Sequence, residues 1–272
     1  MEILFDGVFV VPIIFIFGLV IGSFLNVVIY RYNSGTTLGG RSMCFSCGKT
    51  LRWYELIPVV SFALQLGKCR RCKSRISWQY PLVEILTGCL FVGAYFVAEG
   101  VVELAYLIIQ MLLLVVIAVY DLRHKIIPNL FVYSFSFLAF GYIVYQALAL
   151  GDTTGLLVSV SAGPVCFLPF AALWYFSRGT WMGFGDAKLA LGIGWFLGLS
   201  KAYVAIMLAF WIGTIVGLSL IVYGRITGWR SSAEKVTMKS EIPFGPFLIL
   251  GLLSTIFFEQ YLNTLLSLFI FY

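Results

Sequence analysis

The chain has 272 residues, of which 61% are hydrophobic and only 11% are charged. A soluble domain carries about 45–50% apolar and about 25% charged residues, so these values exclude a soluble globular protein. The net charge is +6, but no basic stretch is interleaved with aromatic residues in the manner of a nucleic-acid-binding module. The composition therefore predicts an all-α polytopic membrane protein that binds no nucleic acid.

Apolar blocks recur along the chain at the length that crosses a hydrocarbon core of roughly 30 Å as a helix. Eight membrane spans are expected, at about 8–30, 80–98, 104–120, 129–149, 156–176, 185–200, 203–224 and 246–271. The sixth is short and glycine-rich, which favours a half-helix or a segment that enters the bilayer only in part. The first is not expected to be a cleaved signal peptide, because Glu2 and Asp6 precede it and no Lys or Arg does.

The distribution of positive charge predicts the orientation of the chain. If the first loop (31–79) faces the cytoplasm, the cytoplasmic segments hold 17 of the 18 Lys and Arg residues. These segments are 31–79, 121–128, 177–188 and 225–242. Lys201 remains on the other side, together with Glu2, Asp6, Glu99, Glu103, Asp152 and Glu259. The positive-inside rule therefore places both termini outside, and the basic loops face anionic headgroups or acidic parts of a partner.

We expect three parts: a first transmembrane helix (1–30), a cytoplasmic four-cysteine loop (31–79) and a seven-helix membrane core (80–272). The four-cysteine loop contains "CFSC" and "CRRC", with 21 residues between them. Their cysteines are Cys44, Cys47, Cys69 and Cys72. Two CxxC pairs typically close four thiolates around a structural zinc ion. Disulfides are disfavoured in the cytoplasm, and the alternatives are a redox role or no bound metal. The apolar segment 56–66 is too short to span and contains Pro58, which favours an interfacial or hairpin element.

Three carboxylates, Glu84, Asp121 and Asp186, lie within or at the ends of the expected spans. Ionisable residues there are costly, and they are candidates for function. The topology places the end of the third span and the start of the sixth at the same face, so Asp121 and Asp186 are expected to meet. Two such carboxylates share a proton, so that one can activate water while the other donates to a carbonyl, as in aspartic proteases.

The glycines and basic residues near Asp121 and Asp186 bear on whether these aspartates are catalytic. Gly183 and Gly185 are expected to permit unusual backbone dihedrals and close approach of a peptide. Anchoring of each aspartate at the interface, near Arg123, Lys125 or Lys188, is the alternative. His124 is the only histidine, so a Ser-His or Cys-His catalytic system would have to use it. The HExxH motif of zinc metalloproteases is absent.

Several motifs together resemble the bacterial type IV prepilin peptidases, the leader peptidases of the GxGD aspartic class. They are "GSFLNVVIYR" (22–31), the four cysteines, "QYPLVE" (79–84), "DLRHKIIPN" (121–129), "GFGDAKL" (183–189) and "IPFGPFL" (242–248). The resemblance covers nearly the whole chain. It implies cleavage of short basic leaders from prepilins or pseudopilins at the cytoplasmic face of the bacterial inner membrane, with Asp121 and Asp186 as the catalytic pair. It also implies N-methylation of the new N-terminal residue by S-adenosylmethionine.

Three further features of the sequence each have two interpretations. Pro243, Phe244, Gly245 and Pro246 form either a rigid turn into the last span or a contact with the aspartate pair. Lys188 either holds Asp186 ionised or extends to the interface. Glu84 either pairs with a loop arginine or, as the resemblance suggests, acts with Gly22 in the methyltransferase half.

Two other classes of protein remain as alternatives. A proton- or ion-coupled transporter would also place aspartates in the membrane, but internal repeats, frequent in transporters, are not evident. A non-enzymatic scaffold for a secretion machine would leave both aspartates without a purpose.

Overall fold

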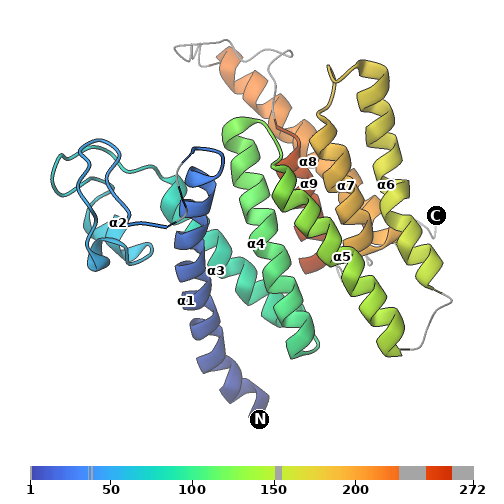
Figure 1. Ribbon diagram of the computed structural model, residues 1–272, viewed down its shortest axis with the longest axis horizontal. Helices are drawn as coiled ribbons and strands as arrows, with labels where there is room; N and C mark the ends of the chain where they lie inside the picture. The colour runs from blue at the N-terminus through green and yellow to red at the C-terminus, as the bar shows by residue number, and fades with distance from the viewer. Residues whose placement is uncertain (1, 36, 38, 151–154, 227–242, 259–272) are drawn as a thin grey trace. The chain divides into compact units, whose positions relative to one another are not determined.

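The computed structural model describes residues 2–35, 37, 39–150, 155–226 and 243–258. In these ranges the chain is helical, and two isolated antiparallel bridges are its only β-structure. The elements are α1 (Glu2–Arg31), η1 (Trp53–Glu55), α2 (Val60–Leu64), α3 (Gln79–Val97), α4 (Val101–His124), α5 (Asn129–Leu150), α6 (Leu156–Ser177), α7 (Phe184–Leu197), α8 (Leu199–Ile226) and α9 (Gly245–Phe257) (Figure 1). A helix lies at each expected span, so the all-α fold is confirmed.

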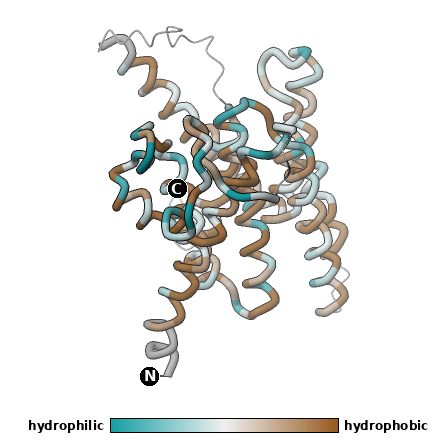
Figure 2. The backbone as a smooth tube through the Cα atoms, turned by 60° about the vertical axis from the view of Figure 1, so that its left-hand side comes forward, coloured by the Kyte–Doolittle hydropathy of each residue, from teal (hydrophilic) through white to brown (hydrophobic). Residues whose placement is uncertain are grey.

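Six helices are long and apolar enough to cross a membrane, namely α1, α3, α4, α5, α6 and α8. Figure 2 shows hydrophobic residues over much of the helical part of the chain. The remaining two expected spans correspond to shorter helices, α7 with 14 residues and α9 with 13. Six spans are therefore supported by length and composition, and the count of eight is not confirmed. Residues 259–271 of the expected last span, Asp152, and loop residues 227–242 lie outside the described residues.

Contacts within the chain divide it into two compact units, Met1–Val116 and Ile117–Tyr272. In the first unit α1 packs along α3. A Cβ on Gly22 would come within 2.8 Å of the Glu84 Cα, so the small residue allows the two backbones to approach. In the second unit α7 contacts α5, α6, α8 and α9, which makes this short helix the centre of the unit. The division into 1–30, 31–79 and 80–272 stays a prediction.

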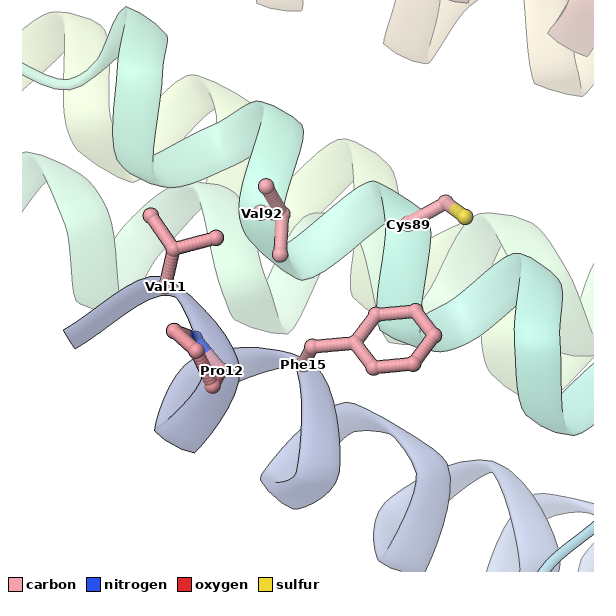
Figure 3. Close-up of a pocket in the computed structure, with 5 residues that line it drawn as sticks. All are labelled: Val11, Pro12, Phe15, Cys89 and Val92. Atoms are coloured by element: carbon pink, nitrogen blue, oxygen red, sulfur yellow. The ribbon is translucent and has the colours of Figure 1, made fainter. Parts of the chain in front are cut away.

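A pocket of about 450 Å³ lies between α1 and α3 (Figure 3). It is lined by Val11, Pro12, Phe15, Cys89 and Val92. Its lining contains apolar side chains and one thiol, with no carboxylate, so Glu84, Asp121 and Asp186 lie outside this pocket.

The four-cysteine loop contributes little regular structure. The apolar segment 56–66 is broken after η1, and only Val60–Leu64 forms a helix. This agrees with the expectation that Pro58 prevents one continuous helix.

Candidate active site and metal centre

Three helix ends meet in the second unit, and two aspartates lie at this meeting point. Asp121 is in the last turn of α4, and Asp186 is in the first turn of α7. Their exposed fractions are only 4% and 7%. Ile127 lies against Gly185, the neighbour of Asp186, and against Gly245, which lies against Asp121. The structure thus brings together two buried carboxylates that are distant in the sequence, and we call them the aspartate pair.

Each member of the aspartate pair accepts a hydrogen bond from a backbone N–H at the start of a helix. The N–H of Gly183, the N-cap residue of α7, donates to the Asp186 carboxylate. The N–H of Gly245, the first residue of α9, donates to the Asp121 carboxylate. Helix starts favour negative charge, because their N–H groups are unpaired and the helix dipole is positive there. Backbone groups therefore hold both acids in place.

Close packing around Ile127 explains why two positions of the site are glycines. A Cβ on Gly185 would lie 2.9 Å from the Ile127 Cβ, and a Cβ on Gly245 would lie 2.6 Å from the Asp121 Oδ2. Gly183 has a φ of −73°, and Gly185 is not among the residues with positive φ. The expectation of unusual dihedrals at Gly183 and Gly185 is therefore wrong. What the glycines supply is room, and Ile127 is a site residue that no sequence pattern indicated.

The "IPFGPF" motif forms a turn that leads into α9. Phe244 is the N-cap residue, and Gly245 and Pro246 are the first two helical residues, where proline costs no hydrogen bond. Pro243 precedes the cap and is partly buried. The Phe244 ring packs against Phe210, with centroids 4.9 Å apart. The motif therefore forms both the turn and the contact with the aspartate pair, because Gly245 is the first residue of α9 and lies against Asp121.

Lys188 is engaged with groups other than Asp186. Its Nζ donates to the Asn129 Oδ1 at 2.8 Å. The ammonium also lies 5.2 Å and 5.0 Å from the ring centroids of Tyr133 and Phe184, close enough for cation–π attraction. Within the described part of the chain, Lys188 forms no ion pair with Asp186. It therefore links α7 to α5 beside the site.

Glu84 and Gly22 lie together in the first unit, on the facing sides of α3 and α1. The Glu84 carboxylate accepts hydrogen bonds from the backbone N–H of Val59, at 2.7 Å, and from the Ser23 side chain. Neither partner is the loop arginine that we considered. Val59 has a φ of 59°, which is rare for a β-branched residue. Glu84 therefore holds a strained turn of the four-cysteine loop against α3, and its role in methyl transfer stays a prediction.

The four cysteine thiols of the loop converge on one point. Their Sγ atoms all lie within 4.8 Å of one another, and those of Cys44 and Cys72 are 3.8 Å apart. Four sulfurs placed tetrahedrally at about 2.3 Å from a zinc ion are roughly 3.8 Å apart. The donor set and its spacing therefore fit a four-thiolate zinc site.

Two similar backbone turns present these cysteines, and we call them the first knuckle (42–51) and the second knuckle (67–76). The Cys44 N–H donates to the Lys49 carbonyl, and the Cys69 N–H donates to the Ser74 carbonyl, both at 2.9 Å. An antiparallel bridge closes each knuckle. The two halves of the metal site are thus built in the same way.

Hydrogen bonds to the Cys44 and Cys72 sulfurs favour the thiolate form that metal binding requires. At Cys47 the Lys49 N–H lowers the pKa, but desolvation and the Cys72 and Cys44 thiols outweigh it and raise the pKa to about 11. The backbone N–H of Ser46 lowers the pKa of Cys44 to about 6. The Ser74 hydroxyl, 3.1 Å from the Cys72 Sγ, lowers the pKa of that thiol. Ser74 is a supporting residue that the CxxC spacing alone did not reveal.

Comparison with known proteins assigns this arrangement to a family. The model described as "Bacterial Peptidase A24 N-terminal domain" matches residues 16–98, and the model described as "Type IV leader peptidase family" matches residues 108–218. The chain is also similar to the prepilin leader peptidase/N-methyltransferase of Bacillus subtilis (strain 168), with 32% identity over 88% of this chain and 90% of that protein. The chain belongs to the type IV leader peptidase family.

Other relatives in the family agree. The prepilin leader peptidase/N-methyltransferase of Vibrio cholerae is 33% identical over 68% of this chain and 76% of that protein. The type 4 prepilin-like proteins leader peptide-processing enzyme of Escherichia coli O78:H11 is 33% identical over 89% of this chain and 91% of that protein. No solved structure matches the chain. The first family model includes the four cysteines, and the second includes both members of the aspartate pair.

Proposed function

We propose that this leader peptidase is an aspartic endopeptidase that removes the leader from prepilins or pseudopilins. The observation that carries the proposal is the aspartate pair, Asp121 and Asp186, buried where the ends of α4, α7 and α9 meet. The names of the relatives in B. subtilis and V. cholerae supply the substrate class.

The proposed chemistry uses the aspartate pair as general base and general acid. Two carboxylates in a site of low dielectric hold one proton between them, because their charges repel. The ionised member removes a proton from water, and the resulting hydroxide attacks the carbonyl carbon of the scissile peptide bond. The protonated member donates to the carbonyl oxygen as the tetrahedral intermediate forms. The N–H groups of Gly183 and Gly245 keep the two acids oriented through this exchange.

We propose that the site lies at the cytoplasmic face of the inner membrane. The charge distribution supports this orientation, with 17 of the 18 Lys and Arg residues on one side. A basic leader reaches the site from the cytoplasm, while the apolar stem of the substrate stays in lipid. The two termini of the chain then lie on the periplasmic or extracellular side.

The relatives' names also support a second activity, N-methylation of the residue exposed by cleavage. S-adenosylmethionine is the expected methyl donor. Both activities can be tested together by incubating the purified full-length protein with a prepilin reporter, with and without S-adenosylmethionine. We expect mass spectrometry to show a product without its leader in both samples, and one additional methyl group only where the donor is present. An intact reporter in both samples would refute the peptidase, and an unmethylated product in both would refute the methyltransferase.

We propose that Cys44, Cys47, Cys69 and Cys72 hold a structural zinc ion. The distances between their sulfurs support this. Four thiolates fill the tetrahedral coordination of zinc, so the ion would stabilise the loop without touching substrate. Zinc content of the purified protein, measured with and without a Cys69→Ser substitution, tests the assignment.

Glu55 is expected to stabilise this zinc-bound loop. Its carboxylate accepts from the Arg52 backbone N–H at 3.0 Å and pairs with Lys49 at 2.9 Å, and its side chain is 1% exposed. The Arg52 N–H, followed by the Lys49 ammonium, lowers the Glu55 pKa below 4.5. Glu55→Gln should destabilise the loop by about 1–3 kcal/mol at neutral pH, seen as faster zinc loss to a chelator.

The pH dependence of this effect has a definite sign. Because the Glu55 pKa is lowered in the folded protein, its contribution is complete above 4.5 and is lost as the pH falls through the lowered value. The difference between wild type and Glu55→Gln should therefore persist at pH 7 and shrink below pH 4.5. Arg52→Gln, which keeps the backbone donor, is the matched control. Equal zinc loss from wild type and Glu55→Gln at pH 7 would contradict the prediction.

A further inference from the structure

Two cations lie side by side on the second knuckle. Lys68 and Arg75 form its antiparallel bridge. The backbone hydrogen bonds of the bridge join the residues before and after Lys68 and Arg75, and none joins these two residues to each other. In such a pair the Cα atoms are about 4.5 Å apart and both side chains project from the same face. Within the described ranges neither side chain forms an ion pair or a hydrogen bond. Like charges directly opposite each other destabilise a bridge, so an anion beside Lys68 and Arg75 would stabilise the pair.

The first knuckle shows that the fold does not need these cations. Its bridge joins Met43 and Thr50. The flanking hydrogen bonds have the same pattern, from Cys44 N–H to Lys49 and from Leu51 N–H to Ser42. The same backbone is therefore built with two uncharged residues in the positions that Lys68 and Arg75 occupy. The cations are a property of the second knuckle alone.

A pocket of about 610 Å³ opens beside the two cations. Lys68 and Arg75 contribute to its lining, and the rest is mainly apolar, including Phe62, Trp78 and Ile85. The rings of Phe62 and Trp78 pack with centroids 4.8 Å apart. Trp78 is nevertheless 70% exposed, so its ring is available for contact with a molecule in the pocket. The pocket is thus cationic on one side and apolar on the other.

The pocket lies beside the start of α3, where this expected span would enter the membrane. Trp78 comes directly before α3, which is long and apolar enough to cross the membrane, and tryptophan is enriched at the membrane–water interface. Ile85 is six residues into α3, roughly 9 Å along its axis. It is 41% exposed and lines the pocket within this expected span, whereas Lys68 and Arg75 precede the span.

From this geometry we propose that the pocket binds an anionic phospholipid. The phosphate accepts hydrogen bonds from Lys68 and Arg75 and removes their mutual repulsion. One acyl chain covers Phe62, Trp78 and Ile85. Phosphatidylglycerol brings one net negative charge to the two cations, whereas a zwitterionic lipid brings none, because its own cation offsets its phosphate. A basic leader peptide has the same sign as Lys68 and Arg75. Bound lipid would therefore fix the second knuckle to the membrane surface.

The test is lipid binding by the full-length, zinc-loaded protein, measured by native mass spectrometry. Short-chain phosphatidylglycerol and phosphatidylcholine are titrated in detergent. The double variant Lys68→Met/Arg75→Thr places the residue types of the first knuckle at the same bridge, so the ribbon should be retained. Arg71→Gln/Lys73→Gln is the matched control, since it removes two exposed charges of the same knuckle without touching the pocket. Zinc content confirms that each variant is folded.

We expect wild type and the control to bind phosphatidylglycerol in preference to phosphatidylcholine, and the double variant to bind it at least about tenfold more weakly. Equal binding by wild type and the double variant, or equal loss in the control, would overturn a specific site. Displacement by glycerol phosphate at the same concentration would reveal a phosphate site instead of a lipid site. Displacement by a prepilin reporter would assign the pocket to substrate. The assay records no cleavage, so its failure is separate from failure of the proposed peptidase.

Discussion

Replacing either Asp121 or Asp186 by asparagine is expected to slow prepilin cleavage by about 10²–10⁴-fold, because neither general base nor general acid catalysis survives without both carboxyl groups. Asparagine has nearly the same size as aspartate and keeps a carbonyl oxygen. The N–H groups of Gly245 and Gly183, which donate to the two aspartates, therefore keep their acceptors. The loss should reflect chemistry and not misfolding. The measurement is the rate at which membranes carrying each variant convert a prepilin reporter to its shorter product.

Glu103→Gln is the matched control for the two aspartate variants. Glu103 lies in the first turn of α4, the helix whose last turn holds Asp121, and this substitution should leave the rate unchanged. Full cleavage by Asp121→Asn or Asp186→Asn would remove that residue from the proposed catalytic pair. The transporter alternative would then be examined by proton or ion flux, and the scaffold alternative by secretion.

Gly245→Ala is expected to abolish most activity while leaving the aspartates in the sequence. The new Cβ would lie 2.6 Å from the Asp121 Oδ2 and 3.2 Å from the Ile127 Cδ1, distances at which the carboxylate must move. A misplacement of about 1 Å costs on the order of 10²-fold in rate. Overpacking of this kind also costs about 1–3 kcal/mol of stability. The rate of reporter cleavage, measured beside the thermal stability of the solubilised protein, separates the two effects.

Gly183→Ala is the control that distinguishes this steric argument from a general need for glycine. A Cβ on Gly183 would lie 3.6 Å from the Asp186 Oδ2, an ordinary contact. Its φ of −73° suits any residue, and alanine keeps the N–H that Asp186 accepts. Gly183→Ala should therefore retain most of its activity, whereas Gly185→Ala, with a Cβ 2.9 Å from the Ile127 Cβ, should lose much of it. Equal loss at all three glycines would contradict the steric explanation.

The helical architecture is predictable from the sequence because lipid imposes a simple rule. A spanning segment must satisfy its own backbone hydrogen bonds, so each apolar block is a helix. The alternation of span direction then determines which ends of the third and sixth spans share a face. This is why the proximity of Asp121 and Asp186 follows from the order of the apolar blocks. The short sixth span is expected from its glycines, and it corresponds to α7, with 14 residues.

The details of the site depend on tertiary contacts that no local pattern encodes. Nothing in "DLRHKIIPN" distinguishes Ile127 from its neighbour Ile126, yet Ile127 is buried against two glycines and Ile126 is 65% exposed. The sequence suggests charged side chains as partners of Glu84, whereas the structure supplies a backbone N–H from Val59. Backbone donors are invisible in a search for complementary residue types.

The length of α7 has a consequence for the membrane itself. With 14 residues, α7 is about 21 Å long, whereas the hydrocarbon core is roughly 30 Å thick. Leu199 begins α8 directly after Gly198, so the chain turns back without extending this helix. A helix shorter than the bilayer is accommodated by local thinning. Thinning around α7 would bring water towards Asp186 in its first turn, and bilayer thickness would then affect how easily water reaches the aspartate pair.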